Sequence, residues 1–198
     1  IADKMIQGGF DKSKMHTLCN FIDVEKCEEA DYLKKDYYCY IGRISHEKGI
    51  KTLIAAANRL PHKLVIIGKG PLDAEMKKLA GPNVEFAGFK QWNEIKRIVG
   101  QARFCVIPSE CYENNPLSVI ESQCLGTPVL GAQIGGIPEL IQEGCNGLHF
   151  RSRDTDDMTA KIQAMYDAPF DYPSIALEAK KRYNSETYYK QLIQLYNL

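Results

Sequence analysis

Residues 37–71 read YYCYIGRISHEKGIKTLIAAANRLPHKLVIIGKGP, and this stretch decides the fold. Apolar runs at 37–42 and 63–68 flank a segment, 49–60, in which apolar residues recur every three or four positions. Continuous apolar runs are typical of strands covered on both faces. Apolar residues that recur every three or four positions, as in 49–60, are typical of a helix. The stretch therefore predicts a strand, a crossover helix and a second, parallel strand.

The same alternation continues to about residue 168. Further apolar runs predict strands at 84–88, 104–108, 128–132 and 147–150. Helical spacing predicts helices at 71–80, 91–101, 116–126, 137–143 and 155–168. Alternating strands and helices indicate a doubly wound α/β domain, 37–168, with a Rossmann-like, six-stranded and mainly parallel sheet flanked by helices.

Two segments lie outside this regular unit. Residues 1–36 contain a short helical stretch, an apparent strand at 14–23 and a charged connector, so we interpret them as an interdomain hinge. Residues 169–198 predict helices at 174–182 and 185–197. The last of these helices has an apolar face that needs a partner, formed by Tyr188, Leu192, Leu195 and Tyr196.

Composition narrows the class of protein. Of the 198 residues, 44% are hydrophobic and 25% charged, which is ordinary for a soluble globular protein. Lys plus Arg and Asp plus Glu number 25 each, so no net charge favours nucleic acid or an anionic membrane. The seven cysteines form no Cys-x-x-Cys pair, which argues against zinc and a disulfide framework and indicates a reducing cytosol. No segment approaches the roughly 18 to 20 apolar residues of a membrane span.

Ligands of a doubly wound sheet bind beyond the carboxyl ends of its strands. The loop after the first strand, GRISHEKG, places Arg43 and Lys48 beside a helix start, where two cations and free N–H groups suit a phosphate. A pair of solvated surface cations is the alternative. The loop after the second strand, GKGP, is either a simple tight turn or a close approach to a ligand, since both need glycine.

The loop after the fourth strand carries two carboxylates, Glu113 and Glu121. Asn115 suits the N-cap of the following helix and Pro116 its first position, which places Glu121 in the second turn. Carboxylates accept hydrogen bonds from paired sugar hydroxyls, and an anion suits the amides of 114–117 between them. Taken singly, Glu113 is better explained as a solvated loop residue and Glu121 as a helix residue favoured by the dipole near the N-terminus. Together with the Gly-rich loop GAQIGGIPELI, these groups fall on one edge of the predicted sheet.

In this order the motifs resemble those of the GT4 group of retaining glycosyltransferases, in the C-terminal, donor-binding domain of their GT-B fold. GRISHEKG is similar to the family's Gly-Arg-x-x-x-x-Lys-Gly element, GKGP to its Gly-x-Gly-Pro turn, and ENNPLSVIE to its Glu-x7-Glu signature. CLGTPVLGAQIGGIPELI matches the segment that follows. The resemblance covers nearly the whole chain, and residues 14–23 resemble the hinge that enters this domain.

The resemblance implies roles for individual residues. Arg43 and Lys48 would hold the donor's diphosphate, Glu113 would contact the transferred sugar, and Glu121 would bind the ribose. The donor-binding set that it implies comprises Gly42, Gly68, Gly70, Gly88, Phe89, Lys90, Asn114, Asn115, Pro116, Leu117 and Glu121, of which 88–90 lie near the base. Protein cations of this kind reduce the need for a metal, so no metal or cofactor is expected besides the UDP- or GDP-linked sugar. Many relatives have Gly-Phe where this chain has Asn114 and Asn115, so the contacts to the donor sugar are expected to differ.

The family's N-terminal domain carries the acceptor site, and by domain size roughly 170 to 200 of its residues should precede this chain. We therefore expect a cytoplasmic fragment that binds donor and is inactive alone, with the glycan or lipid-linked acceptor, and any membrane association, assigned to the other half. A non-catalytic nucleotide-binding or scaffold module of the same fold is the main alternative. A phosphorylase-like enzyme and a flavodoxin-like regulatory domain rank lower.

Overall fold

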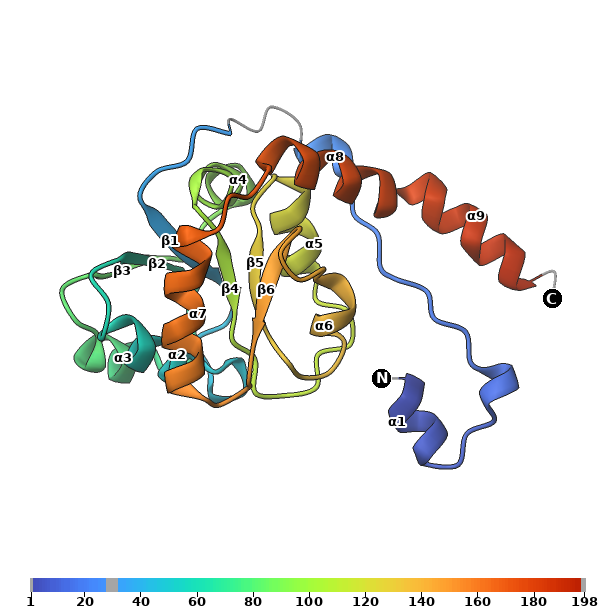
Figure 1. The fold of residues 1–198 in the computed structure, drawn as a ribbon, viewed down its shortest axis with the longest axis horizontal. Coiled ribbons are helices and arrows are strands. Elements are labelled where there is room, and N and C mark those ends of the chain that lie inside the picture. The colour runs from blue at the N-terminus through green and yellow to red at the C-terminus, as the bar shows by residue number, and fades with distance from the viewer. Residues whose placement is uncertain (1, 28–31, 197–198) are drawn as a thin grey trace.

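The computed structural model describes residues 2–27 and 32–196. Its centre is a six-stranded sheet with the order β3-β2-β1-β4-β5-β6 (Figure 1). Every strand pairing is parallel, which confirms the doubly wound architecture expected from the sequence. The strands are β1 (Tyr37–Ile41), β2 (Lys63–Ile67), β3 (Val84–Gly88), β4 (Cys105–Ile107), β5 (Val129–Ala132) and β6 (Gly147–Phe150).

The central strands are buried on both faces. All residues of β4 and β5 are buried, as are the middle three residues of β1. Cys39 and Cys105 face each other in the register of β1 and β4 and are fully buried, as expected of cysteines that behave as small hydrophobic residues. The apolar runs are therefore strands because only a sheet covered by helices on both sides hides them from water.

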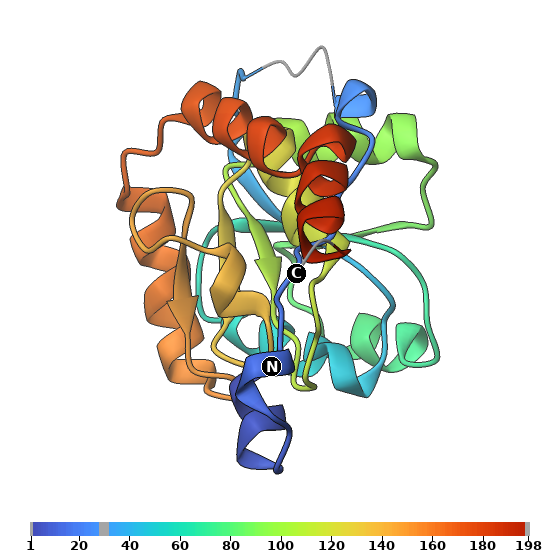
Figure 2. The same cartoon turned by 90° about the vertical axis from the view of Figure 1, so that its right-hand side faces the viewer.

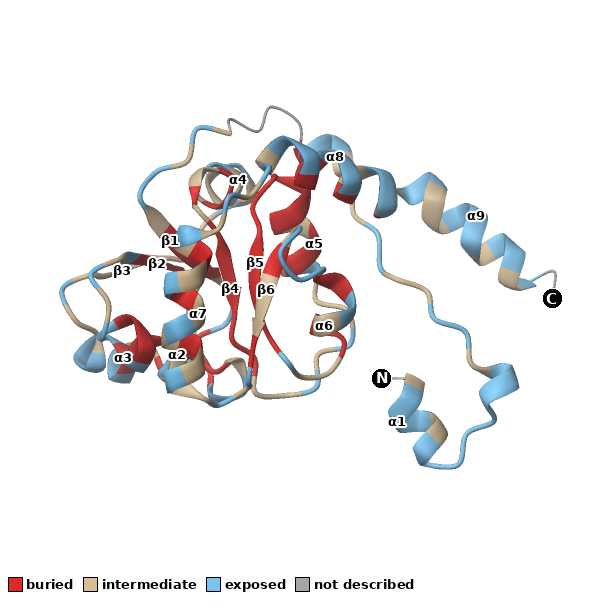
Figure 3. Cartoon of the chain, in the orientation of Figure 1, coloured by how far each residue is buried: buried red, intermediate tan, exposed pale blue. Residues whose placement is uncertain are grey.

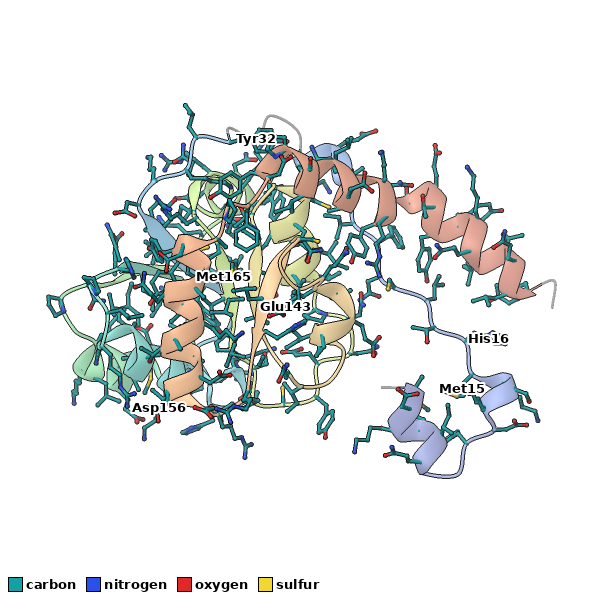
Figure 4. The ribbon with its side chains drawn as sticks, in the orientation of Figure 1. Met15, His16, Tyr32, Glu143, Asp156 and Met165 are labelled. Atoms are coloured by element: carbon teal, nitrogen blue, oxygen red, sulfur yellow. The ribbon has the colours of Figure 1, made fainter. Side chains whose placement is uncertain are left out.

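Helices cover the sheet in two layers. The helices are α2 (Ile50–Ala57), α3 (Asp73–Leu79), α4 (Trp92–Gln101), α5 (Leu117–Cys124), α6 (Ile137–Leu140), α7 (Thr155–Asp167), α8 (Tyr172–Arg182) and α9 (Ser185–Tyr196). On one side α2 packs against α3 and α7, and on the other α5 packs against α6 and α8. Met165 of α7 is buried against the sheet, whereas Asp156 near the start of the same helix points to solvent (Figure 4).

The last two helices behave differently. α8 belongs to the domain, since its residues Ile175, Ala176 and Ala179 are buried and the helix packs on α5. α9 has no buried residue and projects away from the body (Figures 1 and 3). Its Tyr196 is 79% exposed. What covers the apolar face of α9 stays a prediction. The division of the chain into a hinge (1–36), a nucleotide-sugar-binding domain (37–168) and C-terminal helices (169–198) also stays a prediction.

The expected strand at 14–23 is wrong. The chain before the sheet forms α1 (Ala2–Gln7) and two 3₁₀ turns, η1 (Lys12–Lys14) and η2 (Val24–Cys27), and the residues between the turns are irregular. Met15 and His16 lie on this segment far from the sheet (Figure 4), and Figure 2 shows α1 beyond one end of the domain. A strand needs a neighbour for its backbone groups, and in the described part of the chain no strand pairs with this segment. Part of the predicted charged connector, 28–31, lies outside the described residues.

Within residues 2–27 and 32–196, no helix combines the length and the apolar character needed to cross a membrane.

Candidate functional site

The strand order places a crevice between β1 and β4. From β1 the chain proceeds to β2 and β3 on one side, and β4 continues to β5 and β6 on the other, so β1 and β4 mark the topological switch point. Ligands of such sheets bind outside the carboxyl ends of the strands at this point. The loops that follow β1 and β4 touch there, because the backbone N–H of Glu110 donates to the carbonyl of Glu47 at 2.8 Å.

A cavity of about 290 Å³ opens between these two loops. Seven residues predicted from the sequence line it, namely Gly42, Arg43, Lys48, Glu113, Pro116, Leu117 and Glu121. The other lining residues are Tyr40, Ile41, Ile107, Ser109 and Ser118. Both predicted cations and both predicted carboxylates therefore face one space.

A second cavity, also about 290 Å³, adjoins the first and shares Gly42 and Arg43 with it. Gly68, Phe89 and Lys90, all predicted from the sequence, line this second cavity. Phe89 is 65% exposed there, so its ring is accessible for stacking. The two cavities together offer a charged compartment next to one with an exposed aromatic ring.

Lys48, Glu113 and Ser109 form a network at the wall of the first cavity. The Lys48 ammonium donates to Glu113 Oε1, and the Ser109 hydroxyl donates to the same oxygen at 2.8 Å. The side chains of Lys48 and Glu113 are 31% and 17% exposed, so solvent screens this pair only partly. Ser109 is a site residue that sequence reasoning missed as such, although its position directly after a predicted strand was a usable signal.

Two other ionisable groups of the cavity, Arg43 and Glu121, make no side-chain hydrogen bond or ion pair within the described residues. Burial raises the pKa of Glu121, and no described residue donates a hydrogen bond to its carboxylate. The exposed Arg43 guanidinium makes no ion pair within the described part of the chain. Both groups are therefore free to bind a polar ligand in the cavity.

Glycines bring the loops into close contact. Gly49 has φ 66°, and a Cβ there would lie 1.9 Å from the carbonyl oxygen of Pro108. A Cβ on Gly136 would lie 1.8 Å from the carbonyl oxygen of Asn114. The N–H of Gly136 donates to the carbonyl of Glu113 at 2.7 Å. The Gly-rich loop after β5 thus supports the backbone that presents Glu113.

Four predicted residues lie outside both cavities: Gly70, Gly88, Asn114 and Asn115. Gly70 packs against the carbonyl of Ile44, where a Cβ would come within 2.1 Å of the oxygen, so it shapes the loop after β1. Gly88 ends β3 with φ 73°.

The expectation that Asn115 caps α5 is wrong. The helix begins at Leu117, Pro116 occupies the capping position in an extended conformation, and no side chain caps it. The Asn115 Oδ1 instead accepts a hydrogen bond at 2.9 Å from the backbone N–H of Asn20. The side-chain oxygen that would accept a capping hydrogen bond from α5 therefore accepts one from a distant segment instead.

Comparison with known proteins identifies the family. The family profile described as "Glycosyl transferases group 1" matches residues 22–188. This chain belongs to that family. It is 33% identical over 137 residues to the sulfoquinovosyl transferase SQD2 of Arabidopsis thaliana, covering 67% of this chain and 27% of that protein. It is 30% identical over 140 residues to a GDP-mannose-dependent alpha-mannosyltransferase of Corynebacterium glutamicum, covering 71% of this chain and 33% of that one.

Solved structures confirm the fold. The lipopolysaccharide outer core galactosyltransferase WaaB superposes with a TM-score of 0.87 at 16% identity, over 98% of this chain and 58% of that one. Anabaena HepE in complex with UDP-glucose gives 0.81 at 20% identity, over 100% of this chain and 61% of that one. The fold is that of the C-terminal domain of a GT-B glycosyltransferase, as the sequence motifs indicate. The match spans about a quarter to a third of the length of these two curated relatives.

Proposed function

We propose that this chain binds a nucleoside-diphosphate sugar in the crevice between β1 and β4. The single observation that carries this proposal is the convergence of Arg43, Lys48, Glu113 and Glu121 on one cavity. Two cations suit a diphosphate, and two carboxylates suit the hydroxyls of the sugars on either side of it. Structures of HepE with UDP and with UDP-glucose, at TM-scores of 0.85 and 0.81, support a uridine nucleotide as the first candidate.

The neighbouring cavity is suited to the base. Phe89 offers an exposed ring, and Lys90 and Gly68 stand beside it. Because Gly42 and Arg43 line both cavities, one ligand can occupy the two together with its phosphates near the shared wall. Glu121 then binds the ribose, and the first backbone N–H groups of α5, at Leu117 and Ser118, face the diphosphate.

The proposed reaction of the whole protein is transfer of a hexosyl group, with retained configuration, to a glycan or lipid-linked acceptor. The bond between the anomeric carbon and the diphosphate oxygen breaks, and its electron pair leaves with the diphosphate. The acceptor hydroxyl oxygen forms the new bond to that carbon, and the hydroxyl proton passes to the departing diphosphate. Arg43 and Lys48 would stabilise the negative charge that develops on the leaving group. Glu113 would contact the transferred sugar. The donor is a substrate, and the proposed roles of these residues require no resident cofactor.

The acceptor site is proposed to lie on another domain, against which α9 packs through its apolar face. On this proposal the chain alone binds donor without transferring its sugar. The proposed compartment is the cytoplasm, with any membrane association contributed by that other domain. All seven cysteines are free, which fits a reducing compartment.

Titration calorimetry tests the proposal. UDP, GDP and ADP are titrated into the chain beside uridine, guanosine and adenosine, and the tightest nucleotide is then compared with its glucose and mannose conjugates. We expect one diphosphate to bind well above its nucleoside. Equal binding of diphosphates and nucleosides, or no binding at all, would contradict a diphosphate site. Binding without transfer in a protein that includes the acceptor domain would favour the alternative, a non-catalytic nucleotide-binding module.

A further inference from the structure

Residues 19–22, here called the strap, connect the N-terminal segment to the site loop. Asn20 makes two hydrogen bonds to Asn115, which lies 95 positions later. Its backbone N–H donates to the Asn115 Oδ1 at 2.9 Å, and its Nδ2 donates to the Asn115 carbonyl oxygen at 2.9 Å. Each residue uses one backbone group and one side-chain group in these two bonds. The bonds therefore fix the relative orientation of Asn20 and Asn115 as well as the distance between them.

The strap is itself anchored to the domain. The N–H of Ile22 donates to the carbonyl of Tyr183, at the end of α8, at 3.0 Å. The ring of Phe21 lies 4.5 Å from that of Tyr188 in the first turn of α9, centroid to centroid. Cys19 and Ile22 pack against the hydrophobic core. Asn20 is thus held between the corner of α8 and α9 on one side and the site loop on the other.

The loop that Asn20 reaches carries the proposed donor contacts. Asn115 is two residues after Glu113 and two before the start of α5. On its other side the same loop rests on Gly136, through the hydrogen bond to the carbonyl of Glu113. Asn114 is exposed between these two supports. Without the strap, the loop would lose its hydrogen bonds at Asn115 and keep those at Glu113, which come from Gly136, Lys48 and Ser109.

We propose that Asn20 is a positioning residue for the donor site, acting through Asn115. It holds residues 113–117 in the conformation that presents Glu113 and the first amides of α5 to the diphosphate sugar. Asn20 lines neither cavity, so it acts without touching the ligand. Since the strap also touches α9, a displacement of that helix is transmitted to the loop. This inference rests on the proposed function for its ligand, but its structural part stands on the hydrogen bonds alone.

The test compares Asn20→Ala with Asn20→Gln and with a matched control, Thr17→Ala, on the same exposed segment. Hydrogen exchange of residues 112–118 is measured by mass spectrometry in the free chain, and binding of UDP, GDP or ADP is measured beside the matching nucleoside. Losing one hydrogen bond corresponds to about a fivefold change in an equilibrium constant. We expect Asn20→Ala to speed hydrogen exchange in 112–118 and to weaken binding of the nucleoside diphosphate about fivefold. The affinity for the nucleoside should not change. Asn20→Gln keeps an amide donor and should restore part of both effects, whereas Thr17→Ala should change neither.

The two readouts separate failure of this inference from failure of the proposed function. Unchanged exchange at 112–118 in Asn20→Ala overturns the inference whether or not a nucleotide binds. Faster exchange across the whole domain, or equal loss of diphosphate and nucleoside, also overturns it, because general destabilisation would then explain the result. If the unmodified chain binds none of the three diphosphates, the proposed function fails and the assignment of Asn20 to a donor site fails with it.

Discussion

Replacing Lys48 with Met removes the charge of one proposed diphosphate ligand and keeps most of the side chain's apolar stem. In the free chain Lys48 donates to Glu113, which also accepts from Ser109. Hydrogen bonds to charged groups contribute about 1.5–3 kcal/mol, and each 1.4 kcal/mol or so corresponds to a factor of ten in affinity. Because the Lys48 side chain is 31% exposed, we take the lower half of that range and expect UDP binding to weaken about 10- to 40-fold.

The companion change, Glu113→Gln, separates the two partners. It removes the carboxylate that holds Lys48 in the free chain, so the ammonium is released for the phosphate. UDP carries no transferred sugar and loses no contact with Glu113. We therefore expect Glu113→Gln to bind UDP as tightly as the unmodified chain or more tightly, and to bind the diphosphate sugar less well.

Calorimetric titration with UDP and uridine checks both changes. Lys51→Met is the matched control, since it removes the same charge from an exposed position on α2 that lines neither cavity. Two results would refute the reasoning. One is an equal loss of UDP and uridine in Lys48→Met, and the other is a loss in Lys51→Met as large as in Lys48→Met.

Three further predictions concern stability and reactivity. Burial raises the pKa of Glu121, which means that the folded chain favours the protonated carboxyl. The free energy of unfolding is therefore unaffected by this group below the ordinary Glu pKa of about 4.3, and it falls as pH rises through the raised pKa. Glu121→Gln should therefore unfold at higher temperature than the parent at pH 7, with no gain at about pH 4, and thermal unfolding at both pH values would show this. Gly136→Ala should cost about 1–3 kcal/mol in urea unfolding, because its Cβ meets the Asn114 carbonyl; an unchanged midpoint would count against that contact. Among the cysteines, the exposed Cys145 should be alkylated first while the fully buried Cys39 and Cys105 stay protected in the folded chain, as peptide mass spectrometry can report.

The sheet could be predicted from the sequence because its central strands, β1, β4 and β5, are buried on both faces. Each of the six apolar runs became a strand within a residue of its predicted ends, since a parallel sheet leaves no polar face to blur the pattern. The prediction failed at 14–23, where short groups of apolar residues are interrupted by polar ones. Local pattern shows that a segment can be extended but not whether a neighbouring strand is there to receive its hydrogen bonds.

The candidate site was partly predictable for the same topological reason. Loops that follow parallel strands share one edge, so Arg43, Lys48, Glu113 and Glu121 could be placed together before their distances were known. The partner of Asn115 could not be predicted. Asparagine is a common residue at a helix N-cap, so the sequence favours that role for Asn115. Only the folded chain shows that the Asn115 Oδ1 accepts a hydrogen bond from the N–H of Asn20, 95 positions away. Long-range contacts of this kind leave no local signal in a single sequence.

The most direct test of the central claim is a map of the nucleotide's location on this chain. The ¹⁵N-labelled protein, 22.4 kDa, is titrated with UDP, GDP or ADP and followed by amide NMR shifts. We expect the largest shifts at 42–48, at 113–118 and around Phe89. Shifts confined to a third cavity, of about 280 Å³ and lined by Gln142, Asn146 and Ser174, would place the ligand elsewhere and contradict a donor site between β1 and β4.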